Sequence, residues 1–358
     1  MSRTYYIKNG NTFNVTDSQN IDIHDHLPAG TYIVLFDQLK GFFLSQVEPM
    51  TVPAKIYGHT STQVNRIYNT YTKRNRNTGV LLNGEKGSGK TLTLSLLAHT
   101  FMKNGLPVII INSAFCGDDF NKFISEISQP CMIAFDEFDK TYEADDQTKI
   151  LTLLDGVFNS NKLFVLTCND SWKVNSFMLN RPGRIYYNIS YRRLEEDAIR
   201  DYCRDVLVNQ AYIENVISVS NTVDAFNFDM LKALIEEMNR YNETAKDAIA
   251  MLNIRPERSN SINYKYLIAR NGNIINTGEL GYNINPLSGK NFQIGFYEPN
   301  PKFKRSKNND EDEEVYTSVS LSFKDVKRID ATGYLFEKDE LVITLLRENN
   351  SDFSYDAF

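Results

Sequence analysis

Short apolar runs alternate with segments of helical period through the middle of the chain. Such runs suit strands that are buried on both faces of a parallel sheet. Between them, leucines recur on one helical face, as over residues 92–99. This alternation predicts a parallel α/β core with Ile189 inside its last strand. The expected strands cover residues 79–83, 106–112, 131–135 and 163–167, and the expected helices cover residues 61–73, 92–99 and 118–127.

The pattern differs towards both ends of the chain. Residues 1–60 hold short aromatic and β-branched runs separated by turn signals, which predicts a small β domain. Apolar residues recur at helical spacing over residues 194–209 and 228–252, which predicts a helical lid. Short alternating runs return from residue 259 onward. We therefore expect four parts: an N-terminal β domain (1–60), an α/β core (61–190), a helical lid (191–257) and a C-terminal β domain (258–358).

A glycine-rich loop follows the first core strand and precedes a helix. The run Gly84-Glu85-Lys86-Gly87-Ser88-Gly89-Lys90-Thr91 fits the phosphate-binding pattern G-x-x-x-x-G-K-[ST] without a mismatch. This order aims backbone N–H groups and the positive end of the helix dipole at one point, where a polyphosphate fits. Lys90 would reach the β and γ phosphates, and the Thr91 hydroxyl would hold Mg²⁺. Leu92, Tyr57 and Gly58 complete the candidate nucleotide-binding residues.

Polar side chains follow two later strands of the expected sheet. Asp136 and Glu137 end the apolar run 131–135, and Asn169 follows the run 163–167. Asp136 would bind Mg²⁺ through its water shell, and Glu137 would orient and deprotonate an attacking water. Asn169 would help to place that water against the γ-phosphate, although it could instead simply open a turn. The sequence thus predicts both halves of a site that hydrolyses ATP with Mg²⁺.

Composition narrows the classes of partner. A content of 42% hydrophobic and 23% charged residues excludes wholesale disorder. The net charge of -6 favours protein partners and leaves nucleic acid as an alternative. No apolar stretch approaches the roughly 20 residues of a membrane span, and the N-terminus has no signal-peptide pattern, so we expect a cytoplasmic protein. The four cysteines form no C-x-x-C pair, so the sequence suggests neither a zinc site nor a disulfide framework.

With these motifs in order, residues 79–190 resemble the AAA+ ATPases. Residues 79–82 and 130–139 look like the two nucleotide motifs of the AAA branch. Residues 153–157, 166–169 and 181–184 are similar to the family's leucine-Asp-Gly helix, sensor Asn and arginine-finger box. Similar cores occur in the mitochondrial respiratory-complex assembly chaperone and in phage-encoded AAA ATPases. The resemblance implies a ring, most often of six subunits, in which Arg181 and Arg184 complete a neighbour's site; alternatively, one of them pairs with an acid of its own subunit.

The function that the resemblance implies is an ATP-driven ring that remodels a protein or a protein complex. A motor or loader acting on nucleic acid and a nucleotide-gated structural assembly are the alternatives. The abundance of Asn and Tyr is compatible with a phage, and in that case with work in the host cytoplasm. The family's usual loop prolines are replaced by Glu85 and Lys86, and Tyr186 stands near the place of an acid that often follows the arginine box.

Phe115 allows two interpretations. It follows the second core strand and precedes a helix, where AAA translocases carry an aromatic residue that grips substrate in a central channel. Alternatively, its ring covers the end of that strand as part of the core.

Overall fold

The computed structural model describes most of the chain. It covers residues 4–9, 12–17, 22–155, 161–191, 193–223, 225–254, 263–280, 284, 286, 290–299, 314–330 and 332–347. The chain divides into two compact units, the first made of Met1–Ala198 with Asn227–Asp229 and the second of Ile199–Phe226 with Met230–Phe358. Each unit is described by itself below.

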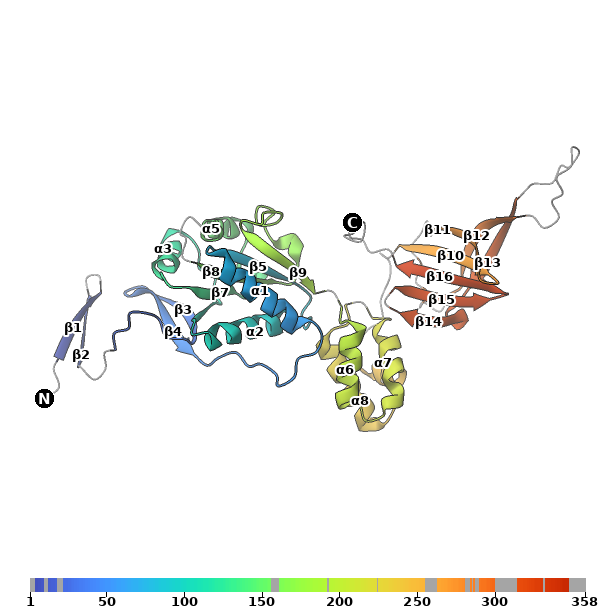
Figure 1. The fold of residues 1–358 in the computed structure, drawn as a ribbon, viewed down its shortest axis with the longest axis horizontal. Helices are drawn as coiled ribbons and strands as arrows, with labels where there is room; N and C mark the ends of the chain where they lie inside the picture. Colours follow the sequence, from blue (N-terminus) through green and yellow to red (C-terminus); the bar gives the residue numbers. More distant parts are fainter. Residues whose placement is uncertain are drawn as a thin grey trace, which may run out of the picture. The chain divides into compact units, whose positions relative to one another are not determined.

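The first unit is built on a seven-stranded sheet with the strand order β4-β3-β6-β7-β8-β5-β9 (Figure 1). Neighbouring strands run parallel, except that β3 and β4 are antiparallel. This arrangement confirms the predicted parallel α/β core. The strands are β3 (Thr31–Asp37), β4 (Gly41–Val47), β5 (Thr78–Gly84), β6 (Val108–Ile111), β7 (Cys131–Phe135), β8 (Lys162–Cys168) and β9 (Ile185–Tyr191).

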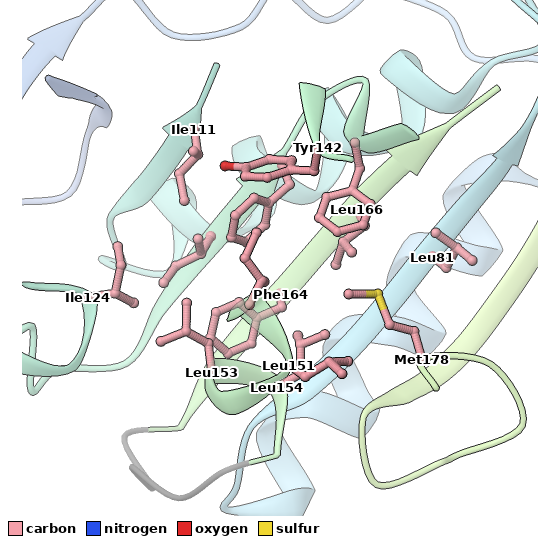
Figure 2. Close-up of a cluster of buried hydrophobic side chains, with 14 of the residues drawn as sticks. Leu81, Ile111, Ile124, Tyr142, Leu151, Leu153, Leu154, Phe164, Leu166 and Met178 are labelled. Carbon is pink, nitrogen blue, oxygen red and sulfur yellow. The ribbon is translucent and has the colours of Figure 1, made fainter. Parts of the chain in front are cut away.

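Helices cover both faces of this sheet, so its central strands are buried on both sides. Side chains alternate along each strand: Val80 and Leu82 join one core cluster, and Leu81 joins the other. Helices α1 (Thr60–Arg74) and α2 (Lys90–Lys103) close the first cluster. Helices α3 (Asp118–Glu126), α4 (Phe138–Thr141) and α5 (Ala144–Leu154) close the second, part of which Figure 2 shows. The two-sided burial explains why these strands read as continuous apolar runs.

The N-terminal region differs from the sequence expectation. A hairpin of β1 (Thr4–Asn9) and β2 (Thr12–Asp17) forms a separate two-stranded sheet. Strands β3 and β4, which we assigned to the same small β domain, instead extend the core sheet, because β3 pairs in parallel with β6. Local pattern shows that an apolar strand forms, but the partner of that strand is set by packing far along the chain. The predicted boundary at residue 60 therefore does not separate these strands from the core.

The second unit contains helices in both stretches of predicted helical spacing. These are α6 (Glu196–Val206, which begins in the first unit), α8 (Phe228–Tyr241) and α9 (Ala245–Met251). A further helix, α7 (Ile213–Ser220), lies between the two stretches and was not predicted. The stretch of helical spacing over residues 228–252 forms two helices, α8 and α9, and the helix ends between them at Asn242, which has a φ of 51°. Thr244 then caps α9, its hydroxyl accepting the Asp247 N–H at 3.3 Å.

The remainder of the second unit is β structure, as predicted, and its strands pair antiparallel. Its five-stranded sheet has the order β11-β10-β16-β15-β14, and β12 and β13 form a hairpin that shares one core with it. The strands are β10 (Tyr264–Arg270), β11 (Asn273–Glu279), β12 (Phe292–Pro299), β13 (Glu314–Leu321), β14 (Val326–Asp330), β15 (Gly333–Lys338) and β16 (Leu341–Arg347). Short 3-10 turns lie at Ser171–Lys173 in the first unit and at Gln210–Tyr212 and Phe323–Asp325 in the second. Within the described ranges, no helix has both the length and the apolar composition needed to cross a membrane.

Candidate nucleotide-binding site

Three neighbouring strands deliver the candidate residues to one edge of the core sheet. Strand β8 lies between β7 and β5, and all three run parallel. The glycine loop starts at Gly84, the last residue of β5, while Asp136 follows β7 and Asn169 follows β8. Because parallel strands present their carboxyl ends at the same edge, the topology alone brings these segments together.

The glycine loop has the backbone that its sequence predicts. Gly84 has a φ of 156°, and a Cβ there would collide with the backbone oxygen of Tyr191 on β9. Gly89 has a φ of 106° and stands at the N-cap of α2, which has no side-chain cap. The first N–H groups of this 14-residue helix are therefore not satisfied by a capping side chain and point at the loop. Such a helix start binds anions.

Lys90 is the buried cation of the loop. Its Nζ donates to the Gly84 carbonyl, to the Glu85 carbonyl at 2.8 Å and to Asn169 Oδ1 at 3.0 Å. Burial lowers the pKa of Lys90, whereas the charges of Asp136 and Asp139 favour its protonated form. The Lys90 ammonium is thus hydrogen-bonded to neutral oxygen acceptors, and a phosphate oxygen could replace one or more of them.

Ser88 supplies a second observation that fits an anionic ligand. Its hydroxyl oxygen is buried and has no hydrogen-bond partner among the described residues. A buried polar atom without a partner is costly, so a ligand that accepts its proton would be favoured.

Asp136 and Glu137 are coupled through a residue that the motif analysis missed. The Thr167 hydroxyl donates to Asp136 Oδ1 at 2.6 Å and accepts the backbone N–H of Glu137 at 2.8 Å. The pairing of Phe135 with Leu166 places Thr167 beside Asp136, so strand register would have found this contact. Thr167 therefore fixes both acids at the end of β7.

Glu137 has a left-handed backbone conformation, with a φ of 48°, which is uncommon for a residue other than glycine. Its exposed carboxylate pairs with Lys140 Nζ at 2.5 Å. The hydrogen bond from Lys140 lowers the pKa of Glu137, so the carboxylate is ionised at neutral pH. An ionised carboxylate can accept a proton from water.

Asn169 is joined to the glycine loop through its bond to Lys90. Its backbone N–H and that of Asp170 donate to Asp139 Oδ2 at 3.2 and 3.1 Å. Asp139 lies on α4 and is another residue to which the sequence analysis gave no role. The predicted sensor Asn is thus held from two directions.

The two arginines of the predicted finger box lie in different surroundings. Arg184 forms an ion pair with Asp155 of the same chain and donates to the Phe177 carbonyl at 2.7 Å. Arg181 is exposed, and its guanidinium lies 5.8 Å from the Phe177 ring centroid. Among the described contacts, neither arginine bonds to Lys90 or to the acids after β7. The next residues of the leucine-Asp-Gly motif, Gly156 and Val157, lie outside the described residues.

The remaining candidate residues surround the loop. Tyr57 stacks on Phe228, with ring centroids 5.9 Å apart, and a Cβ on Gly58 would lie 3.3 Å from Ala198. Asn227, next to Phe228, donates to the Lys86 carbonyl at 3.2 Å. The lid segment Asn227–Asp229 thus reaches the glycine loop, which no local sequence signal indicated.

The residues present fit Mg²⁺ held mainly by a nucleotide. Thr91 is exposed in the first turn of α2, Leu92 beside it is half-buried, and Asp136 is half-buried. In the described part of the chain, no group of three or more His, Cys, Asp or Glu residues is arranged so that it could hold a metal ion. Mg²⁺ usually takes one or two protein oxygens and completes its shell with water and phosphate, so this sparse set suits it.

Phe115 lies in an aromatic cluster beside β4. Its ring centroid is 5.2 Å from that of Phe42 and 6.1 Å from that of Phe120. Its carbonyl accepts the Tyr142 hydroxyl at 3.0 Å. These contacts favour the interpretation that Phe115 covers the core.

Comparison with known proteins agrees with this geometry. Residues 80–192 match the family described as "ATPase family associated with various cellular activities (AAA)". An alignment of 213 positions, which covers 53% of the chain, shows 25% identity to a Plasmodium falciparum (isolate 3D7) protein named "Putative cell division cycle ATPase". The match covers only 17% of that relative's length. The glycine loop, the acids after β7 and Asn169 all lie within the matched range, so the candidate site falls in the part of the chain that is similar to this ATPase family.

Proposed function

We propose that the chain binds Mg-ATP at the edge formed by β5, β8 and β7 and hydrolyses it there. The observation that carries this proposal is the gathering of Lys90, Asn169 and the Asp136–Glu137 pair at the ends of adjacent parallel strands. The loop N–H groups, Ser88 and Lys90 would hold the phosphates, and Thr91 and Asp136 the metal. When bound, Mg-ATP supplies the reacting phosphoryl group and the charge of the metal.

Glu137 is the proposed base. Its ionised carboxylate, fixed at the backbone by Thr167, would accept a proton from the attacking water. For this the carboxylate must turn from Lys140 towards the phosphate side, which costs little because the ion pair is exposed. Asn169 would hold the water in line with the phosphate.

We further propose that the active unit is a ring, most simply of six subunits, in which Arg181 completes the neighbour's site. Charge spread over the transferring phosphoryl group needs a fixed cation besides Lys90 and Mg²⁺. An exposed arginine with its rigid fork of donors suits this role. Arg184 is already held by Asp155, so it would support the segment that carries Arg181.

The work of this ring is proposed to be the remodelling of a protein or protein complex in the cytoplasm. The net charge of -6 opposes a general affinity for nucleic acid. The β1–β2 hairpin and the C-terminal β structure lie outside residues 80–192, and we assign them to the recognition of the substrate. A phage source, with the host cytoplasm as the place of work, is compatible with this proposal.

A mixing experiment tests the shared site. Subunits with Arg181→Ala are combined with subunits with Lys90→Ala, each nearly inactive alone, and phosphate release is measured over a range of ratios. We expect activity to recover, because mixed rings contain some sites with both an intact loop and a neighbouring Arg181. Arg66→Ala, which removes an exposed arginine of α1, is the control and should stay active. Absence of recovery despite proven co-assembly would refute the shared site.

A further inference from the structure

We propose that Asp139 is a positioning residue that sets the sensor Asn169 for hydrolysis. Asp139 lies on α4, two residues after the proposed base. A single carboxylate oxygen, Oδ2, accepts the backbone N–H groups of both Asn169 and Asp170, at 3.2 and 3.1 Å. These two peptide groups form the turn that leaves β8 beside Lys90. The inference rests on the proposed hydrolysis at this site.

The chain keeps a costly group at this position. Asp139 is only 8% exposed, and its other oxygen, Oδ1, is buried without a hydrogen-bond partner among the described residues. A buried carboxylate is unfavourable unless its oxygens are satisfied, and a neutral side chain would fill the same space more cheaply. A buried hydrogen-bond acceptor that is retained at such a cost suggests a use beyond packing.

That use follows from how Asn169 is held. In this structure its side chain is anchored through Lys90 Nζ, at 3.0 Å. When Lys90 turns to a phosphate, this bond is given up and the amide must keep its place by other means. The two hydrogen bonds that Asp139 accepts fix the two peptide planes that flank the Asn169 Cα, so they can hold the amide near the attacking water. A displacement of about 1 Å in such a group can cost a hundredfold in rate.

The alternative is that Asp139 merely ties α4 to the end of β8. Such a role would lower the thermal stability of a variant and would leave Asn169 and Asp139 independent in their effects on turnover. Stability alone therefore cannot separate the two roles, whereas the coupling between the two residues can.

A double-mutant cycle on the full-length chain measures that coupling. The variants are Asp139→Ala, Asn169→Ala and the two combined, with kcat and KM for ATP, the affinity for a fluorescent ATP analogue and the melting temperature as readouts. We expect Asp139→Ala to lower kcat about tenfold or more while nucleotide affinity changes by less than about threefold. We expect the double variant to match Asn169→Ala, because the action of Asp139 passes through Asn169. Asp139→Asn, whose amide oxygen can still accept, should restore most of kcat.

The matched control is Asp145→Ala, which removes an exposed acid in the first turn of α5 and should leave kcat unchanged. If Asp139→Ala does not fold, Asp139→Ser replaces it in the same cycle, since serine is too short to reach both N–H groups. Multiplying, independent effects of Asp139 and Asn169 on kcat would overturn this inference and leave the proposed ATPase intact. Absence of turnover in the folded wild-type chain would overturn the proposed ATPase, and the inference with it.

Discussion

The Arg184 guanidinium binds the Asp155 carboxylate of the same chain through two of its N–H groups. The Nη2–Oδ2 distance is 2.7 Å, and the arginine side chain is only 14% exposed. The ion pair raises the pKa of Arg184 further above its already high value, so this charge is permanent. The pair connects the end of α5 to the segment before β9, and it separates Arg184 in role from the exposed Arg181.

The first prediction is that loss of Arg184 lowers stability, whereas loss of Arg181 lowers turnover. Arg184→Ala should lower the free energy of unfolding by about 1–3 kcal/mol, because it breaks a partly buried bidentate pair and a bond to a carbonyl. Arg181→Ala should stay within about 0.5 kcal/mol of the wild type, as is usual for an exposed residue, and yet lose turnover. Denaturant melts and phosphate release measure the two effects. Equal losses of stability would contradict the distinction.

A second prediction concerns Thr167, whose hydroxyl joins Asp136 to the Glu137 N–H. Thr167→Val keeps the shape of the side chain but leaves the part-buried Glu137 N–H without this acceptor, so we expect a loss of about 1–3 kcal/mol in stability. Turnover should fall by more than nucleotide affinity, because both acids lose their fixed position. Thr167→Ser, which keeps the hydroxyl, should retain turnover. A valine variant with unchanged kcat would rule out this positioning role.

Phe115 carries the third prediction. Its ring packs on Phe42 and Phe120, so Phe115→Ala should destabilise the first unit by roughly 2 kcal/mol, less than the 3–5 kcal/mol of a fully buried Phe. A thermal melt shows the loss as a lower midpoint. An unchanged midpoint combined with lost remodelling would support the channel interpretation instead.

Thiol reactivity gives a fourth prediction, which tests the described packing. Burial raises the pKa of both Cys131 and Cys168 to about 12, and that of Cys203 to about 11. Cys116 is half-buried, and its pKa is raised by burial and by its bond to Asp146. Because the thiolate is the reactive form, we expect Cys116 alone to react in the native chain near neutral pH. Its reaction should be slow and should become faster as the pH rises. Mass spectrometry after alkylation identifies the site, and rapid labelling of Cys168 would contradict the packing beside Asn169.

The parts that could be predicted from the sequence are those set by local pattern. The spacing of the motif residues predicted the glycine loop, and continuous apolar runs predicted strands such as β7. Asp136 and Asn169 followed because parallel strands end at one edge of a sheet.

The contacts that escaped prediction all join distant segments. The bonds of Thr167 to the acids span about thirty residues, and the bond of Asn227 to Lys86 spans 141 residues. The pairing of β3 with β6, which moved β3 and β4 into the core sheet, likewise depends on tertiary packing. The pattern of one sequence indicates the local propensity for helix or strand, whereas tertiary packing determines which distant segments come into contact.

The most direct test of the proposed ATPase compares the wild type with Glu137→Gln. This change removes the proposed base and leaves the glycine loop and Asp136 in place, so affinity for ATP with Mg²⁺ should persist. Loss of a general base typically costs about 10²–10⁴-fold in rate, and we expect phosphate release to fall by that range. Lys90→Ala is the contrasting control and should weaken nucleotide binding itself. Phosphate release by Glu137→Gln at the wild-type rate, or no release by the folded wild-type chain with Mg-ATP, would contradict the account.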